Sequence, residues 1–310
     1  MDFFSILLIV AGLVLFETVS SIDNAVINAE VLATMGKKAR RFFLTWGIFL
    51  AVFLVRGLLP WLIVFLTVPD ISFWGSFIAT FSNDPSVAQA IQASAPILLL
   101  GGGVFLLFLF LHWLFLEPKN FGLRGERFFL RQGAWFYAIV SILLTLIVWF
   151  AMAIDPLLAF GAVVGSTAFF ITHGFRQHAE EAERRMMGNT GMSDVSKILF
   201  LEVIDMSFSI DGVLGAFAFT LSVPLILLGN GIGAVMVRQL TVANIERVKK
   251  YVFLKNGAMY SIFFLGLVMV TGAFGIHMPE WLAPAVTFFI IGYFFWKSRL
   301  TLSLKSDLHA

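Results

Sequence analysis

Long apolar runs constrain this chain more than any other feature, because about 20 consecutive apolar residues match the hydrocarbon core of a bilayer. We place nine such spans, at about 3–34, 42–67, 95–116, 133–153, 156–174, 194–220, 223–244, 257–276 and 281–297. Hydrophobic residues make up 59% of the 310 residues and charged residues 13%, more apolar surface than a soluble core needs. The sequence therefore predicts an all-α, polytopic membrane protein surrounded by lipid.

Basic residues lie in alternate loops between these spans. Lys and Arg follow the first, third, fifth, seventh and ninth spans, as Lys37 and Lys38 do after the first. The segment 68–94 and the turns near Asp155 and Ser222 contain neither residue type. Because basic loops stay on the cytoplasmic side, we expect the N-terminus outside and the C-terminus in the cytoplasm.

Two spans carry acidic residues at matching positions. Glu17 and Asp23 lie six positions apart in the first span, and Asp205 and Asp211 have the same spacing in the sixth. A charged side chain at the bilayer centre costs at least about 2.5–3.5 kcal/mol, so such residues usually mark an ion pathway. The first and sixth spans run in opposite directions, which is typical of an inverted-topology repeat.

The repeat predicts how a single transmembrane domain, residues 1–310, is organised. We expect spans 1–3 in residues 1–116 to form the first repeat and spans 6–8 in residues 193–276 to form the inverted second one. Residues 117–192 then hold the connecting spans 4 and 5, with cytoplasmic loops. Residues 277–310 hold the last span and a cytoplasmic tail.

The two motif helices are expected to break near mid-membrane. On a straight helix, Glu17 and Asp23 would point about 120° apart. Ser20 and Ser21 in the first motif and Gly212 in the second favour local unwinding, since serine satisfies freed backbone groups and glycine tolerates unusual dihedrals. Unwound turns expose carbonyl oxygens, which together with carboxylates suit a hard cation.

These observations predict a divalent-cation site between spans 1 and 6. The candidate ligands are Glu17, Asp23, Asn24, Glu202, Asp205 and Asp211. Oxygen ligands suit Mn²⁺, Mg²⁺ and Ca²⁺ alike, and the cation is expected as substrate, with no permanently bound cofactor. Candidates for proton coupling or charge balance are Glu30, Arg56, Arg238 and His112.

Coupling to protons is expected because export of a cation against an inward-negative potential is uphill, by about 2.3 kcal/mol per charge per 100 mV. Clustered carboxylates can exchange metal for protons. Glu30 has no acidic counterpart in the second copy, where Ala218 stands, and is the candidate proton carrier. Arg56 and Arg238 could neutralise only part of the acidic charge, so a purely structural role for the acids is the weaker interpretation.

The acidic motifs resemble those of the TerC family, which is named for tellurium resistance and grouped with LysE-like transporters. The resemblance rests on Glu17, Asp23 and Asn24 in the first span and on Glu202, Asp205, Phe208, Ser209, Asp211 and Gly212 in the sixth. Gly212, where a serine is expected, and the long segments 68–94 and 176–192 depart from the family and indicate a divergent branch. The resemblance implies a multi-pass protein of the bacterial inner membrane that exports divalent metal, manganese above all.

Two other functions compete with transport. An accessory membrane protein that hands metal to exported partners fits the same residues, and the sequence does not separate it from a transporter. An intramembrane aspartyl protease also keeps aspartates in its spans, but its GxGD signature is absent, so we expect no enzyme. The chain has no cysteine, which excludes disulfides and thiolate metal sites. Nothing indicates nucleic-acid binding, and a homo-oligomer is left open.

Overall fold

The computed structural model describes residues 2–47, 58, 61, 65, 71–81, 85–119, 121–187, 193–244, 248–276 and 278–307. All regular structure in these ranges is helical. Six helices among them are long and apolar enough to cross a membrane, namely Phe3–Ser20, Ala93–Leu116, Gly133–Met152, Pro156–His178, Val223–Val242 and Leu254–Ala273. The chain is therefore a multi-pass helical membrane protein, in agreement with the predicted class.

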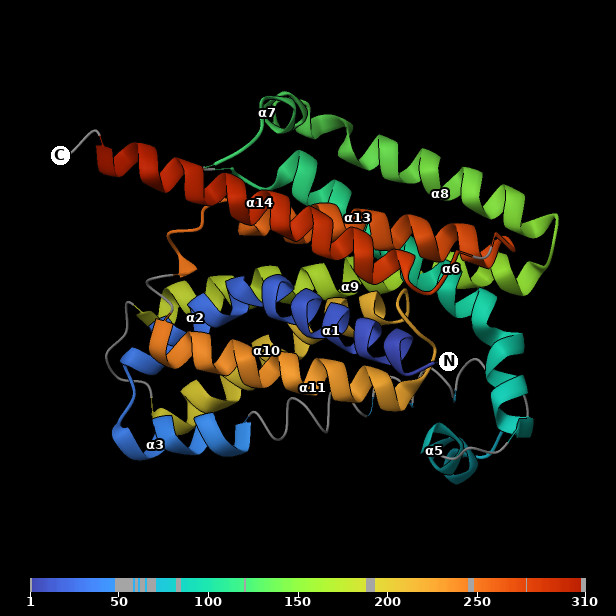
Figure 1. The fold of residues 1–310 in the computed structure, drawn as a ribbon, viewed down its shortest axis with the longest axis horizontal. Coiled ribbons are helices and arrows are strands. Elements are labelled where there is room, and N and C mark those ends of the chain that lie inside the picture. The colour runs from blue at the N-terminus through green and yellow to red at the C-terminus, as the bar shows by residue number, and fades with distance from the viewer. Residues whose placement is uncertain are drawn as a thin grey trace.

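The helices follow one another in the order shown by the colours of Figure 1. They are α1 (Phe3–Ser20), α2 (Ile22–Ala33), α3 (Lys37–Phe42), α5 (Phe73–Phe81), α6 (Pro85–Leu116), α7 (Arg124–Leu130), α8 (Phe136–Met152), α9 (Pro156–Met187), α10 (Asp194–Ala216), α11 (Val223–Gln239), α13 (Leu254–Ala273) and α14 (Leu282–Asp307). Short turns of other helix types are η1 (Phe43–Gly47), η3 (Gly133–Trp135) and η4 (Leu240–Asn244).

Helix α6 forms the centre of the bundle. It packs against α13 on one side and α9 on the other, while α1 packs against α11 and α8 covers α9 (Figure 1). Of the six apolar helices, α6 is the most buried and α8 the least. The core accordingly consists of large apolar side chains, among them Leu100, Phe105 and Phe108 of α6 and Phe169 of α9.

Glycines allow α6 and α9 to approach closely. A Cβ atom at Gly165 of α9 would lie 2.0 Å from the backbone oxygen of Gly101 of α6, and one at Gly161 would lie 2.8 Å from the backbone oxygen of Ile97. Small residues at such contacts are typical of packed membrane helices, because dispersion contacts and not the exclusion of water hold the helices together.

Three of the nine predicted spans are not among the six apolar helices. The predicted span 42–67 falls mostly outside the described residues. The predicted spans 194–220 and 281–297 correspond to α10 and α14, which are helical. Helix α10 contains several acidic residues, and α14 ends in polar and basic residues, so composition alone does not identify them as spans. The number of spans above six stays a prediction.

The first motif helix is interrupted and the second is not. Helix α1 ends at Ser20 and α2 begins at Ile22, with Ser21 between them at φ −89° and ψ 8°. Helix α10, in contrast, continues from Asp194 through Asp211, so the expected break there is wrong. The reason is local: the Ser209 hydroxyl donates to the carbonyl of Asp205, at 2.6 Å, within an intact helix and not across a gap.

The loop that joins α6 to α7 fixes the end of α6. The ammonium of Lys119 donates to the carbonyls of Trp113 and Leu114, at 2.6 and 2.9 Å, and so satisfies acceptors at the helix C-terminus. The buried carboxylate of Glu126 accepts hydrogen bonds from the amide of Asn256 on α13, at 3.0 and 2.8 Å. The loop thereby holds Glu117, directly after α6, against the first turn of α13.

The glycine contact between α6 and α9 generates a stability prediction. We expect Gly165→Ala to lower the free energy of unfolding by about 1–3 kcal/mol, because two backbones must separate to admit the methyl group. Gly174→Ala, on the same helix with open space around it, is the matched control. It should be neutral or stabilise by up to about 1 kcal/mol. Thermal unfolding of the purified protein in detergent measures both, and equal midpoints would contradict the packing described here.

Candidate functional site

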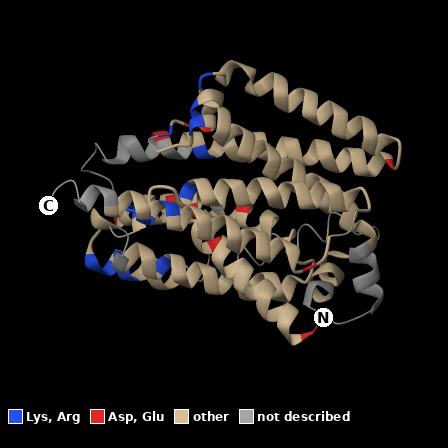
Figure 2. Ribbon diagram, turned by 45° about the horizontal axis from the view of Figure 1, so that its top comes forward, with Lys and Arg blue, Asp and Glu red and all other residues tan. Residues whose placement is uncertain are grey.

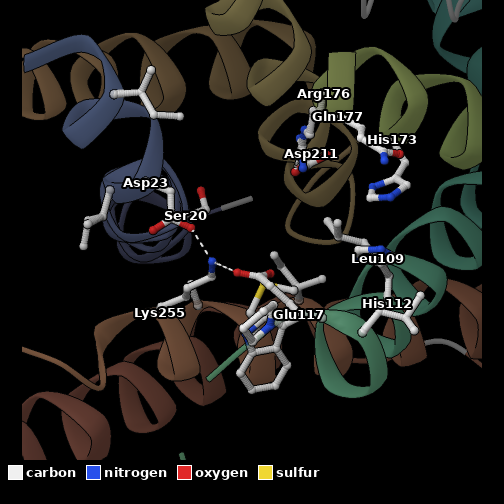
Figure 3. A pocket seen from close by; sticks show the side chains of 18 of the residues that line it. Ser20, Asp23, Leu109, His112, Glu117, His173, Arg176, Gln177, Asp211 and Lys255 are labelled. Carbon is white, nitrogen blue, oxygen red and sulfur yellow. Dashed lines mark hydrogen bonds and ion pairs between the residues drawn. The ribbon is translucent and has the colours of Figure 1, made fainter. Parts of the chain in front are cut away.

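A charged cavity of about 680 Å³ lies between the helices (Figure 3). Side chains from the α1–α2 junction and from α6, α9, α10 and α13 line it. Its charged and titratable members are Asp23, His112, Glu117, His173, Arg176, Asp211 and Lys255. Such a group inside a membrane bundle is costly unless the charges are paired, and it is the usual mark of a functional site.

Lys255 joins two acidic side chains on one side of the cavity. Its ammonium lies 2.8 Å from Asp23 Oδ2 and also forms an ion pair with Glu117 Oε1 (Figure 3). The three residues come from α2, from the loop after α6 and from the first turn of α13, so one lysine ties three segments together. Burial raises the pKa of the Glu117 carboxyl, and the Lys255 ammonium offsets part of that effect.

A second ion pair lies across the cavity. Arg176 of α9 donates to Asp211 Oδ2 of α10. Asp211 is only 7% exposed, and its other oxygen, Oδ1, has no hydrogen-bond partner among the described residues. Three cavity carboxylates therefore face two basic side chains, which leaves one formal negative charge if both histidines are neutral.

Glu17 lies outside this cavity, although it is fully buried. The Ser21 hydroxyl donates to Glu17 Oε1, at 3.0 Å. The side chain points toward α10 and α11, where a Cβ atom at Gly212 would lie 2.4 Å from Glu17 Oε2 and one at Gly233 would lie 2.6 Å from Glu17 Cβ. Gly212 thus gives room for a buried carboxylate, which explains its presence in an unbroken helix.

A polar seam runs where α2 packs antiparallel to α10. The Asn24 amide donates to Asp205 Oδ1, and further along, the Lys197 ammonium donates to the carbonyl of Thr34, at 3.1 Å. Three oxygens in this region have no hydrogen-bond partner among the described residues: Asn24 Oδ1, Asn28 Oδ1 and Glu202 Oε1. Buried acceptors without donors are unusual, so this seam can accept additional cations or protons.

The six predicted ligands are thus divided among three neighbouring places. Asp23 and Asp211 line the cavity, Asn24 and Asp205 meet at the seam with Glu202 one turn earlier on α10, and Glu17 lies between α1, α10 and α11. Across the ranges that the structure describes, no three His, Asp or Glu side chains are placed to share a metal ion. The six residues are neighbours in space, but as the structure places them they do not surround one common ion position.

The predicted proton-coupling and charge-balancing residues are placed as follows. His112 lines the cavity. Glu30 lies near the protein surface, 3.2 Å from the ammonium of Lys249. Arg238 lies in the last turn of α11, and Arg56 lies outside the described residues.

Sequence reasoning missed the residues that balance the cavity charge. Lys255 and Arg176 were assigned to cytoplasmic loops because they stand at the ends of apolar runs, where span boundaries are least certain. Asn28 and His173 were also missed. Asn28 could have been predicted from the sequence, because it stands four positions after Asn24 and therefore on the same helix face.

The fold and the cavity define a polytopic helical membrane protein with ion pairs around a cavity between its helices. The chain belongs to the family described as "Protein of unknown function (DUF475)", whose model matches residues 22–303. It is also similar to the uncharacterized membrane protein YceF of Bacillus subtilis (strain 168), with 32% identity over 83 residues. That match covers 27% of this chain and 32% of the relative, so the chain spans about a third of the relative's length. No solved structure matches the chain.

The family match corrects the resemblance to TerC. A model that covers residues 22–303 is that of a different family, so assignment to TerC is wrong. The resemblance rested on acidic residues in two short helical segments. Acids of this spacing reflect the chemistry of intramembrane carboxylates, which different families can share.

The Lys255 bridge generates the second prediction. Lys255→Met should lower the free energy of unfolding by about 1–2 kcal/mol, because Asp23 and Glu117 lose their shared cation. This is less than the roughly 3–5 kcal/mol for breaking a fully buried pair, since the lysine side chain is 36% exposed. Lys250→Met, at an exposed position in the same segment, is the control and should change stability by about 0.5 kcal/mol or less. Urea or thermal unfolding in detergent compares them, and an unaffected Lys255→Met protein would argue against the bridge.

Proposed function

We propose that the protein is a transporter that carries a cation through the cavity between α2, α6, α9, α10 and α13. The observation that carries this proposal is the arrangement of three carboxylates and two basic side chains around one cavity inside a membrane bundle. Ion pairs that served structure alone would be expected to pack without space between them, because a well-packed apolar contact is at least as stabilising.

In the proposed mechanism the Lys255 ammonium occupies the position of the transported cation whenever no cation is bound. Its ammonium lies between Asp23 and Glu117, where two carboxylates from different segments face each other. An entering cation would compete with the ammonium for these oxygens, and its departure would let the lysine return. Arg176 would leave and rejoin Asp211 in the same way, so the site would never hold unpaired carboxylates for long.

A divalent metal cation is the proposed substrate class. Carboxylate and amide oxygens in the cavity and at the seam are ligands that Mn²⁺, Mg²⁺ and Ca²⁺ accept. Manganese was favoured through the resemblance to TerC and loses that support, so we propose the class without choosing the ion. Proton coupling remains part of the proposal. Burial raises the pKa of Glu117, so its carboxyl takes up protons at a higher pH than an ordinary glutamate does.

The inverted-topology repeat belongs to this proposal, and one pair of contacts supports it. The offset of 188 residues that aligns Glu17 with Asp205 also aligns Asn24 with Gly212. Glu17 lies against Gly212, and Asn24 is hydrogen-bonded to Asp205. Exchanging the two copies therefore converts one contact into the other, as a pseudo-two-fold axis between α1–α2 and α10 requires.

The orientation is inferred from where the basic residues lie. In Figure 2 the described Lys and Arg residues gather in the half of the molecule that carries the C-terminus, away from the N-terminus. We infer that this end faces the cytoplasm of a bacterial inner membrane. Glu117 follows the last turn of α6, and Lys255 stands in the first turn of α13. The cavity would thus be loaded from the cytoplasmic side, as export requires.

Cation flux into proteoliposomes with an imposed pH gradient tests the proposal. We expect flux of at least one of Mn²⁺, Mg²⁺ and Ca²⁺ that depends on the gradient. Asp23→Asn and Asp211→Asn should each reduce it at least about tenfold, because a cavity carboxylate is lost. Glu280→Gln, which alters an exposed carboxylate in the loop before α14, is the matched control and should not change flux.

Four outcomes, one of which adds a binding measurement, would contradict parts of the proposal. No flux above empty liposomes for any of the ions would refute transport, and cation binding without flux would favour the accessory protein. Equal flux in wild type and both Asp variants would show that the cation does not pass through this cavity. Flux that ignores the pH gradient would remove proton coupling and leave the rest standing.

A further inference from the structure

Two histidines stand side by side on the cavity wall. The rings of His112 on α6 and His173 on α9 have centroids 3.9 Å apart, with their planes at 52°. Both residues line the cavity (Figure 3). They come from different helices, so tertiary packing and not local sequence brings them together. The closely packed α6–α9 interface holds them in place.

Aromatic neighbours orient the two rings without satisfying their nitrogens. Phe136 meets the His112 ring edge-on, with centroids 5.6 Å apart, and Phe169 stacks on the His173 ring at 5.9 Å. Neither imidazole has a hydrogen-bond partner among the described residues. A neutral imidazole carries one donor and one acceptor nitrogen, and because both residues line the cavity, these nitrogens are accessible to a ligand.

A second observation on the same wall points to a ligand. Arg176 stands one turn after His173 on α9 and pairs with Asp211 Oδ2. The other oxygen, Asp211 Oδ1, is buried without a hydrogen-bond partner in the described ranges. The side of the cavity that carries the two histidines, opposite the Asp23–Lys255–Glu117 bridge, therefore also carries the Asp211 carboxylate (Figure 3).

We propose that His112 and His173 together bind a transition-metal ion of the class that prefers imidazole, such as Zn²⁺, Co²⁺ or Ni²⁺. Metal–nitrogen bonds of about 2.0–2.1 Å allow two ligand nitrogens on one ion to be up to about 4 Å apart. Ring centroids 3.9 Å apart place the two imidazoles within reach of one ion once side-chain rotations turn a nitrogen of each ring toward it. Imidazole ligands favour these ions over Mg²⁺ and Ca²⁺, which take oxygen ligands.

The proposal rests on the proposed function in one respect, because it narrows the transported divalent cation to a transition metal. The pair supplies two ligands, and no group of three is preformed in the described residues. Water would complete the shell. A site with few protein ligands and open positions releases its ion more readily than a closed structural site does, as a transport step needs.

Cobalt binding tests the pair directly, because the visible absorption of Co²⁺ reports its ligands. We expect the purified full-length protein to bind Co²⁺ with bands typical of nitrogen ligation, and Zn²⁺ to displace it. His112→Phe and His173→Phe, which keep an aromatic ring among phenylalanines, should each weaken Co²⁺ affinity at least about tenfold. His178→Phe, an exposed position on the same helix, should bind as wild type does.

Each remaining outcome decides for or against the site. Co²⁺ affinity that is unchanged in both variants, or absent in the wild type, would overturn the proposal. If a phenylalanine variant is not monodisperse in gel filtration, His112→Gln and His173→Gln take its place with the same expectation. Flux of Mg²⁺ or Ca²⁺ without Co²⁺ binding would refute this site and leave transport intact. Co²⁺ binding at the pair without flux of any ion would support this site and refute the transport function.

Discussion

The neutralisation of the carboxylates around the cavity is the interaction on which the rest of this structure depends. Carboxylates such as Asp23, Glu117 and Asp211 are costly inside a membrane bundle unless each has a positive partner. Lys255 serves two of them and Arg176 the third. Since these five side chains come from α2, the α6 end, α9, α10 and α13, their pairing sets how those segments meet. A cavity remains because long basic side chains span a gap that backbones do not close.

Packing around α6 supports this arrangement. Glycine contacts bring α9 against α6, and the Glu126–Asn256 and Lys119 hydrogen bonds hold the loop after α6 against α13. The scaffold on one side of the cavity is thus tightly fixed. The opposite side contains the interruption at Ser21, where the chain can bend with less loss of hydrogen bonding.

The sequence predicted the class of protein, the acidic positions and the interruption in the first motif helix, because each depends on local composition. It could not predict where the acids point. Glu17 and Asp23 are six residues apart, yet one is enclosed by glycines of α10 and α11 and the other meets Lys255. Those directions follow from tertiary packing. The second motif was predicted to break because Gly212 was interpreted as a flexible position, whereas it makes room for Glu17.

The same limit explains the missing partners and the wrong family. Lys255 and Arg176 stand at the ends of apolar runs, and the positive-inside pattern assigns such residues to loops. Nothing in the sequence indicated His173, because only the packing of α9 against α6 brings it next to His112. Two short acidic segments resembled TerC, but the model matching residues 22–303 belongs to another family. The comparison therefore corrects the family assignment, and the roles predicted for these residues stay predictions.

Cation protection of a cavity cysteine tests the central claim most directly, because the chain has no cysteine of its own. Val26 lines the cavity and carries no charge, so Val26→Cys reports on the space without removing a proposed ligand. In inside-out vesicles, the account predicts that a small thiol reagent modifies this cysteine and that saturating divalent cation slows the modification several-fold. Modification at the same rate with and without every cation tried would contradict a cation pathway through this cavity.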